Sequence, residues 1–485
     1  MEHKNGFIKN FLWKFLERTL TQLVSLVVSV ILARLLLPKD YGVISMVTIF
    51  ITFADILIVS GLPSALIQKK DADDVDFSSV FYCNLAISML LYIVLFISSP
   101  YIALFFDMPI LSAVLKILGI RVILSSISSV QHAYVSRHMI FKKYLWATLI
   151  GTLISGLVGV VLAYAGAGVW ALVIQQLTGA IISTSVGFFV IKWIPKLLFS
   201  WKKLIALFSY GWKILFESVF ETFTQQIRNL IIGKVYTSDD LGYYTKAQQF
   251  PNLVISNIVT SVSAVLFPAM SNVQDNKEQV KNLMRKSAKL SYYVLFPLMF
   301  GLALVAEPFV LVLLTEKWID CVPYLQIFCF TQGATIGMTV RHEALKSIGR
   351  SDVYMYEHMI YRIAVFAILF AVYKISVMAI ALSLIAGSII MSVTVGVTSK
   401  KYNDYKFREQ LIDVLPTFFA CLVMAVPVYF VGMINLPTII SLGLQVFVGA
   451  VTYLLISIIF KLEGYIYICD LVKSFMRSRK GKESV

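Results

Sequence analysis

The sequence predicts an all-α, polytopic membrane protein with 14 transmembrane helices, arranged as two six-helix lobes in parallel repeat plus two extra helices. Three observations carry this prediction. Of the 485 residues, 59% are hydrophobic and only 14% are charged, with a mean hydropathy of +0.82, a composition that soluble domains do not reach. The chain contains 14 apolar runs of roughly 20 residues, the length of a helix that crosses a bilayer. An 18-residue segment also recurs in outline 200 positions later.

Helices are expected for all of these runs, because an open strand edge leaves backbone groups unpaired in lipid and none of the runs alternates as barrel strands do. The first run is too long for a signal-peptide core and no small-residue cleavage site follows it, so it is expected to remain in the protein. The expected spans are residues 16–37, 41–62, 78–100, 110–131, 144–164, 168–191, 210–232, 249–270, 290–314, 322–340, 353–373, 375–398, 411–433 and 438–460.

The recurring segment covers Ala33–Phe50 and Gly233–Phe250, which align without a gap. Each copy is expected to form an outer turn between two helices, with its aspartate capping the second helix and its glycine making the turn. Six helices precede residue 200, so the repeats are parallel and predict lobes at residues 1–200 and 201–400, followed by helices 13 and 14 with a basic cytoplasmic tail at 401–485. Such repeats are typical of membrane transporters. The chemically matched pairs are Arg34 with Lys234, Asp40 with Asp240, Gly42 with Gly242 and Phe50 with Phe250.

Lysine and arginine are distributed unequally between alternate connections. With the N-terminus placed inside, 31 of the 42 basic residues lie in inside connections, 6 lie outside and 5 lie within or at the ends of spans. This is the positive-inside pattern, so both termini are expected in the cytoplasm. The net charge of +15 is therefore expected to face anionic lipid rather than nucleic acid.

Catalytic and metal chemistry are not indicated. No connection is long enough for a soluble catalytic domain, so the protein is not expected to be an enzyme, and the five histidines form no ligand spacing, so no metal or cofactor is expected. The aspartates at 71, 73, 74 and 76 lack the glycine and glutamate of a calcium loop and are expected to form a solvated cytoplasmic loop. The five cysteines are expected to be apolar core residues. They are Cys83, Cys321, Cys329, Cys421 and Cys469.

The segment ARLLLPKDYG at residues 33–42 resembles polysaccharide flippases of the Wzx/WzxC type, in the multidrug/oligosaccharidyl-lipid/polysaccharide exporter superfamily. The resemblance implies lobes that rock between inward-open and outward-open states, with an oligosaccharide on undecaprenyl pyrophosphate as the cargo. It also implies a cavity walled by helices 1, 2, 7 and 8, and an extra helix pair that forms a groove for the lipid tail. Further resembling positions are Gly61-Leu62-Pro63, Asp240-Leu241-Gly242-Tyr243-Tyr244 and Phe267-Pro268-Ala269.

The same resemblance implies a location and partners. The expected location is the bacterial cytoplasmic (inner) membrane, and the expected partners are the lipid-linked oligosaccharide, membrane lipids, and the polymerase and glycosyltransferases of one polysaccharide pathway. A cation-coupled multidrug exporter of the same superfamily and a peptidoglycan-precursor flippase remain alternatives.

A pyrophosphate headgroup requires a wet cavity with cationic donors, and the planar fork of arginine suits phosphate. Run 210–232 carries Glu217, Glu221, Gln225 and Arg228, spaced by 4, 4 and 3 residues, which predicts that they share one helix face. Charges at membrane depth usually face a cavity or a partner, so cavity lining and structural pairing both remain open.

Arg18 and Gln22 form a similar stripe in the first run, while Arg34 and Lys234 mark the outer ends of the first and seventh runs; snorkelling is the alternative role for these cations. The expected headgroup or cavity residues are Arg18, Gln22, Arg34, Gln225, Arg228 and Lys234. The expected coupling or network residues, which either titrate or only hydrogen-bond, are Glu17, Asp55, Glu217 and Glu221. Ion pairs within each lobe are expected for Lys116, Arg121, Glu357, His358 and Arg362.

Overall fold

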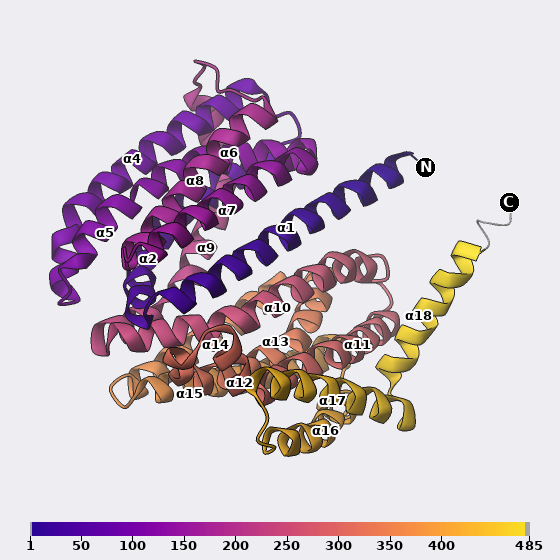
Figure 1. Ribbon diagram of the computed structural model, residues 1–485. Coiled ribbons are helices and arrows are strands. Elements are labelled where there is room, and N and C mark those ends of the chain that lie inside the picture. The colour runs from indigo at the N-terminus through magenta and orange to yellow at the C-terminus, as the bar shows by residue number, and fades with distance from the viewer. Residues whose placement is uncertain (1, 481–485) are drawn as a thin grey trace. The chain divides into compact units, whose positions relative to one another are not determined.

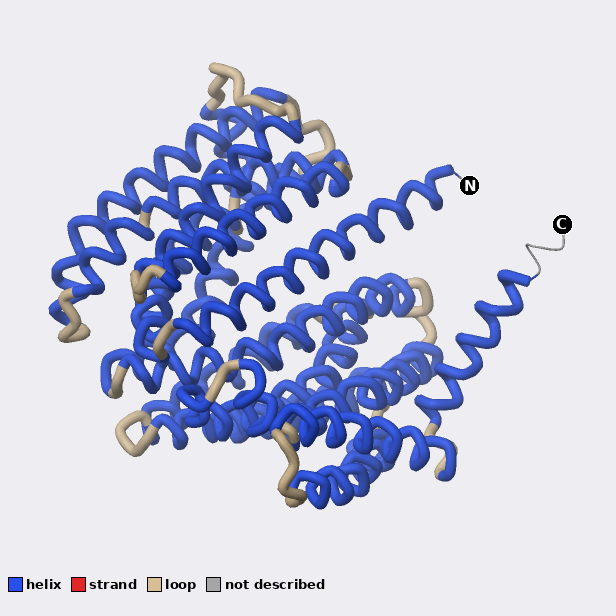
Figure 2. The backbone as a smooth tube through the Cα atoms, viewed as in Figure 1, coloured by secondary structure: helices blue, strands red, loops and turns tan. Residues whose placement is uncertain are grey.

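The computed structural model describes residues 2–480, and every regular element in that range is a helix (Figures 1 and 2). The all-α prediction is therefore confirmed. Twelve helices are long and apolar enough to cross a membrane. The expected spans 210–232 and 322–340 are also helical, but they are more polar than the twelve, so the count of 14 stays a prediction.

Contacts divide the chain into two compact units, Met1–Thr245 and Lys246–Val485. In the first unit α1 packs on α7, α7 on α8, and α9 on α2 and α3. An apolar core formed by α3, α4, α6 and the segment after α8 includes Leu66, Phe77 and Trp193. The helices are α1 (Glu2–Leu35), α2 (Pro38–Val59), α3 (Leu62–Gln68), α4 (Asp74–Phe105), α5 (Ile110–Leu118), α6 (Ile120–His138), α7 (Phe141–Tyr164), α8 (Val169–Ile191), α9 (Trp201–Val235) and the first two turns of α10 (Ser238–Ser271).

In the second unit α11 packs on α13 and α16, α13 on α15, and α16 on α17. The lobe boundaries at 200 and 400 remain a prediction, and residues 481–485 of the basic tail lie outside the described residues. After α10 the helices are α11 (Lys277–Leu304), α12 (Ala306–Leu313), the 3-10 helix η1 (Glu316–Cys321), α13 (Val322–Ser347), α14 (Ser351–Val372), α15 (Val377–Asn403), α16 (Phe407–Gly432), α17 (Thr438–Ile459) and α18 (Glu463–Lys480).

The repeated segment is mostly helical, and this corrects the expected spans 210–232 and 249–270, because most of the residues between them are helical as well. α1 and α2 are separated by residues 36–37, and α9 and α10 by residues 236–237. Asp40 Oδ2 accepts from the Leu37 backbone N–H at 3.0 Å. Asp240 Oδ2 accepts from the Thr237 backbone N–H at 3.1 Å. Both aspartates lie in the first turn of their helices rather than before them as expected, and each accepts the backbone N–H of the residue that precedes its helix. These contacts allow each helix to begin directly after a two-residue turn.

The glycines of the repeat allow two helices to cross closely, rather than forming the expected turns. A Cβ atom on Gly42 would lie 1.8 Å from the carbonyl oxygen of Ser238, and a Cβ on Gly242 would lie 2.1 Å from that of Pro38. The two contacts are equivalent in the repeat: a shift of 200 positions converts Gly42 into Gly242 and Ser238 into Pro38. Side chains this close to a neighbouring backbone are excluded, so α2 and the first turns of α10 cross where only glycine fits.

A third contact lies at the centre of this crossing. The hydroxyls of Ser45 and Thr245, which are themselves 200 positions apart, are hydrogen-bonded at 3.0 Å. Ser45 and Thr245 are therefore each other's equivalents in the two copies of the repeat. The two copies of the motif therefore contact one another about a local two-fold relation, which is the arrangement expected of a duplicated unit; the repeat of the remaining helices stays a prediction.

The aspartate cluster before α4 is an ordered, paired cap, which corrects the expectation of a solvated loop. Asp76 is fully buried, and its carboxylate accepts from Lys69 at 2.7 Å. Asp73 and Asp76 each accept the other's backbone N–H, at 2.9 and 3.1 Å. Lys203 of α9 forms an ion pair with Asp73, so the hydrogen bond from Lys203 holds the pKa of Asp73 well below its usual range.

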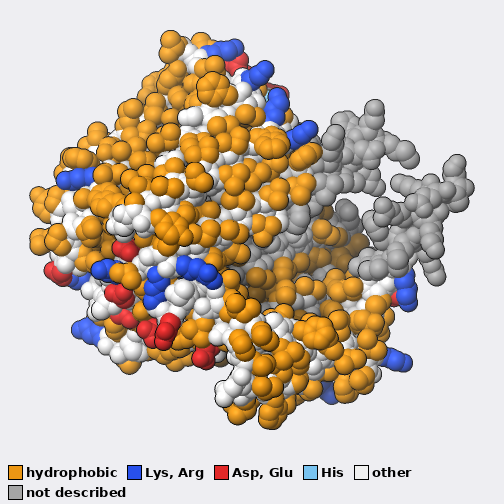
Figure 3. All heavy atoms as spheres, in the orientation of Figure 1, with side chains coloured by type: hydrophobic (Ala, Val, Ile, Leu, Met, Phe, Trp, Pro, Cys, Tyr) orange, Lys and Arg blue, Asp and Glu red, His pale blue; other side chains and the backbone are white. Residues whose placement is uncertain are grey.

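Hydrophobic side chains cover most of the visible face of the molecule, and charged side chains are confined to a few groups (Figure 3). Large apolar residues on α4 and α17 are strongly exposed, including Leu104 at 74% and Ile459 at 70%. An aqueous protein rarely exposes so much contiguous apolar surface. The surface therefore matches the lipid contact that the composition predicts.

Candidate functional site

The polar stripe of α9 lies on one face of an unbroken helix, as its spacing predicts. Packing of α9 against α2 uses other positions: Phe223 lies 6.2 Å from Phe53 between ring centroids, and a Cβ on Gly233 would lie 3.1 Å from Met46. Helical geometry places Arg228 about 140° around the axis from both α9 positions. The stripe therefore faces away from α2.

Within this stripe one residue is buried and three are exposed. Glu217, Glu221 and Gln225 are exposed, and Gln225 Nε2 donates to Glu221 Oε1 at 2.9 Å. Arg228 is only 6% exposed. Glu217 and Glu221 are therefore accessible from outside, while Arg228 is buried.

The Arg228 guanidinium lacks the partners that structural pairing would supply. Its Nε and Nη2 atoms are buried without a hydrogen-bond partner among the described residues. Burying an unpaired donor costs about 1–3 kcal/mol, and more when the group is charged. Arg228 therefore retains donors for a ligand or water, which favours cavity lining over structural pairing.

The polar residues of α1 lie on different sides of the helix, one of which packs on α7. Glu17 accepts a hydrogen bond from the Thr148 hydroxyl of α7 at 3.3 Å, and a Cβ on Gly156 of α7 would lie 2.4 Å from Val28. Arg18 and Gln22 are partly buried and lie about 100–140° around the helix from Glu17. Glu17 therefore has a structural contact, while Arg18 and Gln22 lie off the side that packs on α7.

The paired cations at the helix ends have different surroundings. Arg34 is exposed at the end of α1. Lys234 Nζ binds Asp107 Oδ2 at 3.1 Å, donates to the Phe105 carbonyl and lies 4.9 Å from the Phe105 ring centroid. Lys234 thus ties the end of α9 to the end of α4, a structural role that its spacing does not reveal; headgroup contact stays a prediction for both cations.

Of the residues expected in intralobe ion pairs, Arg121 has an acidic partner and Glu357 faces a histidine. Arg121 of α6 lies 3.9 Å from Asp55 of α2 and donates to Gln176 of α8 at 3.0 Å. Asp55 therefore belongs to a network joining three helices of the first unit. In the second unit Glu357 lies 3.2 Å from His342 and accepts from Thr398.

The structure contains a charge network between α11 and α16 that the sequence did not predict. Asp413 has a fully buried side chain and accepts from Arg285 Nε and Nη2 at 2.7 Å each, from the Tyr405 hydroxyl at 2.8 Å and from Lys289 at 3.2 Å. Glu409 binds Lys281 at 3.0 Å. The signal was the four-residue spacing of the α11 cations, which matches that of the two acids.

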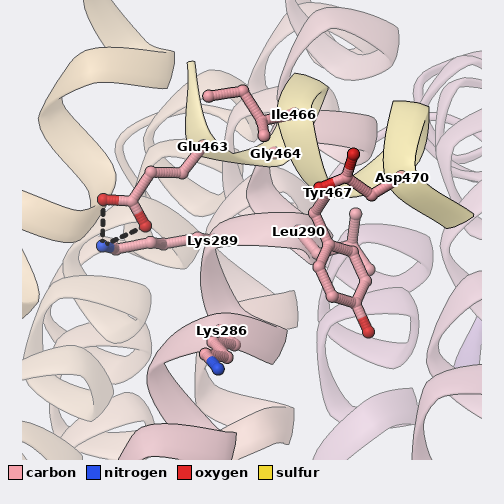
Figure 4. A pocket seen from close by; sticks show the side chains of 8 residues that line it. All are labelled: Lys286, Lys289, Leu290, Glu463, Gly464, Ile466, Tyr467 and Asp470. Atoms are coloured by element: carbon pink, nitrogen blue, oxygen red, sulfur yellow. Dashed lines mark hydrogen bonds and ion pairs between the residues drawn. The ribbon is translucent and has the colours of Figure 1, made fainter. Parts of the chain in front are cut away.

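A small pocket lies between α11 and α18 (Figure 4). It has a volume of about 220 Å³ and contains Lys286, Lys289, Tyr467 and Asp470 in its lining. Lys289 is engaged, because its Nζ lies 2.6 Å from a carboxylate oxygen of Glu463. The residues around this pocket therefore hold α18 against α11.

The second unit also contains an apolar groove. It has a volume of about 460 Å³ and lies between α11, α12, α16 and α17. α16 and α17 occupy the expected spans 411–433 and 438–460, and a lipid tail in this groove stays a prediction of the resemblance. The lining includes Pro297, Leu298, Phe309, Met424, Val446 and Leu454.

Metal-ligating side chains do not converge within the described part of the chain, where no group of three or more His, Cys, Asp or Glu residues could hold an ion. All five cysteines are free, and Cys321, Cys329 and Cys421 are buried, as expected for core residues. The polar groups of the site are therefore suited to hydrogen bonding and charge contact.

Comparison with known proteins identifies relatives across most of the chain. A family model described as "Polysaccharide biosynthesis protein" matches residues 31–323. The succinoglycan biosynthesis transport protein ExoT of Rhizobium meliloti (strain 1021) is 26% identical over 356 residues, which cover 73% of this chain and 72% of ExoT. The teichuronic acid biosynthesis protein TuaB of Bacillus subtilis (strain 168) is 25% identical, with 63% of each chain covered. The lipopolysaccharide biosynthesis protein WzxC of Escherichia coli (strain K12) is 22% identical, with 65% of each covered.

Solved structures show the same fold. The lipid II flippase MurJ in an inward closed conformation superimposes with a TM-score of 0.74 at 16% identity, covering 93% of this chain and 98% of MurJ. An inward-facing multidrug resistance MATE family transporter of the MOP superfamily gives a TM-score of 0.61 at 11% identity, covering 79% and 94%. The chain therefore belongs to the polysaccharide biosynthesis protein family of membrane transporters and has the fold of MurJ and MATE proteins.

Proposed function

We propose that this protein is a flippase that moves undecaprenyl-pyrophosphate-linked oligosaccharide repeat units across the bacterial inner membrane by alternating access. Its product serves the biosynthesis of a surface polysaccharide, exopolysaccharide or lipopolysaccharide. The family match and the names of ExoT, TuaB and WzxC support a polysaccharide cargo. The exposed apolar surface and the twelve apolar helices support a multi-pass membrane carrier.

The buried guanidinium of Arg228 is the observation that carries the proposal. A pyrophosphate presents several anionic oxygens, and arginine can bind two of them through parallel N–H donors. Arg228 has two donor nitrogens that lack a hydrogen-bond partner in the described part of the chain. Glu221 and Glu217, about two and three turns away, make this face polar but not uniformly positive, which lets the sugar hydroxyls be held weakly enough to be released.

The apolar groove on α16 and α17 supports the same cargo, because a polyprenyl chain needs a continuous apolar surface. The orientation follows from the positive-inside bias: both termini are cytoplasmic, and α9 and α13 complete 14 spans. The polymerase and glycosyltransferases of the pathway are the proposed partners.

Two other cargoes are compatible with the fold. A peptidoglycan precursor would require the same headgroup chemistry, while an organic cation would use the exposed Glu217 and Glu221. The names of the relatives favour the polysaccharide cargo over both. In addition, Asp55 is held by Arg121, which removes one of the acids that a cation-coupled exporter would use.

Deletion of the gene tests the cargo. The expected result is loss of one surface polysaccharide and accumulation of its lipid-linked repeat unit in the inner leaflet. An unchanged glycan profile without an accumulated intermediate would contradict the proposal. Drug-stimulated proton or sodium flux in proteoliposomes would instead support the multidrug exporter.

Substitution of Arg228 tests the site. Arg228→Ala is expected to lower the rate of oligosaccharide export by about 10–100-fold, the equivalent of one or two charge-assisted hydrogen bonds. Arg228→Lys should retain part of the activity, because it keeps the charge but loses the paired geometry. Arg350→Ala is the control, since Arg350 is 40% exposed in its side chain and bound to Asp352. Equal export by both Arg228 variants would remove the phosphate argument.

A further inference from the structure

Three helices of the second unit meet through polar side chains near one end. His342 lies five residues before the end of α13, Glu357 six residues after the start of α14, and Thr398 five residues before the end of α15. Glu357 Oε2 lies 3.2 Å from His342 Nε2, and Glu357 Oε1 accepts a hydrogen bond from the Thr398 hydroxyl. We call these three residues the polar junction.

The polar junction is buried, and its carboxylate has few donors. Glu357 is 1% exposed and His342 is 8% exposed. Although the two facing atoms are 3.2 Å apart, neither His342 Nε2 nor Glu357 Oε2 has a hydrogen-bond partner among the described residues. Within residues 2–480 the Thr398 hydroxyl is the one hydrogen-bond donor to this carboxylate. An ionised Glu357 beside a neutral His342 would therefore be a poorly compensated buried charge.

The number of protons on the pair determines its net charge. With one proton, the pair is either a neutral imidazole beside a carboxylic acid or an imidazolium beside a carboxylate, and the net charge is zero in both forms. Loss of that proton leaves a buried anion, while a second proton leaves a buried cation, and burial disfavours both. In water at about pH 7.5, a glutamate is ionised and most histidine is neutral. Hydration of the pair therefore releases one proton at this pH.

The charged groups of α13 next to the pair have partners of their own. Glu343 and Lys346 bind each other at 3.2 Å, and Arg341 donates to an amide oxygen of α16 at 2.6 Å. The ring of His358 packs 5.1 Å from that of His342 between centroids. The remaining titratable side chains at this end of the helices that pack on α13 and α14 are Tyr292, Tyr354, Arg362, Lys400, Lys401 and Tyr402.

An apolar cluster one turn further into the same helices holds them together independently of the pair. Met338 of α13 and Val395 of α15 are buried there, with Tyr361 of α14 packed against them. Beyond it, a Cβ on Gly387 of α15 would lie 3.0 Å from Val365 of α14, so these two helices are closely packed. The polar junction lies outside this cluster, toward the helix ends. It can therefore be hydrated without separating the helices along their length.

We propose that His342 and Glu357 bind a single proton, and that this proton determines whether the polar junction is closed or hydrated. The step is a reversible protonation, in which the closed pair takes one proton from water and the hydrated pair returns it. A lower pH therefore favours the closed junction, and a higher pH favours the hydrated one. The pair lies apart from the expected headgroup and coupling residues and needs no cargo, so it goes beyond the proposed function.

Spin-label distances in lipid nanodiscs test this site. The labels replace Met355 of α14 and Val397 of α15, which are 55% and 63% exposed, in a background without native cysteines. The distance is expected to increase reversibly as the pH rises from about 6 to 8.5. Above about pH 6.5, the ratio of closed to hydrated junction should fall about tenfold per pH unit, as the release of one proton requires. A distance that does not change with pH would overturn the proposal.

Glu357→Gln distinguishes a proton site from an ordinary ion pair. Glutamine is neutral and resembles the protonated carboxyl group, so the junction should stay closed at every pH and the variant should melt no lower than the native protein at about pH 7.5. An ordinary ion pair predicts the opposite, because an imidazolium would lose its buried partner. A lower melting temperature with a hydrated junction at every pH would thus contradict the proton site.

His342→Gln tests whether the proton is shared. The tenfold slope should remain, but it should begin at about pH 4.3 instead of about pH 6.5, because the hydrated state then titrates as a glutamate alone. An unchanged onset would exclude His342 and overturn the pair. Glu278→Gln removes an exposed carboxylate in the first turn of α11 and is the matched control, which should behave as the native protein does. None of these measurements involves a cargo, so their outcome and that of the export assays are independent.

Discussion

The crossing of α2 with the first turns of α10 offers the sharpest test of the fold, through Gly42→Ala. The new Cβ would lie 1.8 Å from the Ser238 carbonyl oxygen, whereas real Cβ atoms essentially never approach within 3.0 Å. The obstacle is backbone, so no side-chain rotation can relieve it. The two helices must separate by about 1 Å, and overpacking of this kind costs about 1–3 kcal/mol.

Thermal unfolding in detergent micelles measures this cost. Gly42→Ala and Gly242→Ala should destabilise the protein by similar amounts, because Gly242 has an equivalent contact at 2.1 Å. Gly443→Ala is the control: nothing lies within 4 Å of its Cβ position, and alanine is preferred over glycine in a helix by up to about 1 kcal/mol. Gly443→Ala should therefore be neutral or stabilising.

Cross-linking reports the geometry of the same crossing independently of stability. The hydroxyl oxygens of Ser45 and Thr245 are 3.0 Å apart, which is compatible with a disulfide after substitution of both by cysteine in a background without native cysteines. Oxidation should form the cross-link readily, and Gly42→Ala should slow it. Unchanged melting and unchanged cross-linking in Gly42→Ala would refute the reasoning from close contact.

Three further outcomes are expected. Asp413→Ala should destabilise the second unit by about 1–3 kcal/mol, because it leaves the buried Tyr405 hydroxyl without its acceptor while Arg285 keeps Glu409; chemical unfolding measures this loss, and a cost below about 0.5 kcal/mol would contradict it. Lys234→Ala should cost less than about 1 kcal/mol, because its ion pair is partly exposed, and a large loss of stability would indicate a different role. Because the folded pKa of Asp73 is depressed, the stability that its ion pair with Lys203 adds is present above the unfolded pKa of about 3.9 and is lost as pH falls through the folded value. The difference in melting temperature between native protein and Asp73→Asn should thus be constant from about pH 8 to 5 and vanish in stronger acid, and a difference that vanished already at pH 6 would contradict this assignment.

The sequence predicted the helical class, most helix positions and the polar face of α9, because each follows from spacings of three to four residues within one helix. It also located the repeat, but assigned its glycines to turns. A glycine in a turn and a glycine at a helix crossing look alike in one sequence. The difference depends on a backbone nearly 200 residues away, such as Ser238 opposite Gly42.

Polar partners were the least predictable part of the site. Spacing places Glu221 and Arg228 on the same face of α9 and predicts no difference in their exposure. In the structure Glu221 is exposed, whereas Arg228 is buried with two donors unpaired among the described residues. Lys234 and Arg34 are equivalent by repeat, yet spacing does not reveal that Lys234 is bound to Asp107 at the end of α4. Exposure and pairing depend on which helix lies alongside, and local spacing carries no information about that.

By itself, the sequence determined that this chain is a helical membrane protein with a repeated motif and a strong charge asymmetry, and the motif placed it near the polysaccharide flippases. Only the tertiary structure decided which buried charges are satisfied, as Asp413 is, and which buried polar atoms lack a partner among residues 2–480, as in Arg228. The reason is physical: burial of apolar surface depends on composition and periodicity, and both can be read from the sequence. Hydrogen bonds and ion pairs act over about 3 Å between residues such as Arg285 and Asp413, 128 positions apart.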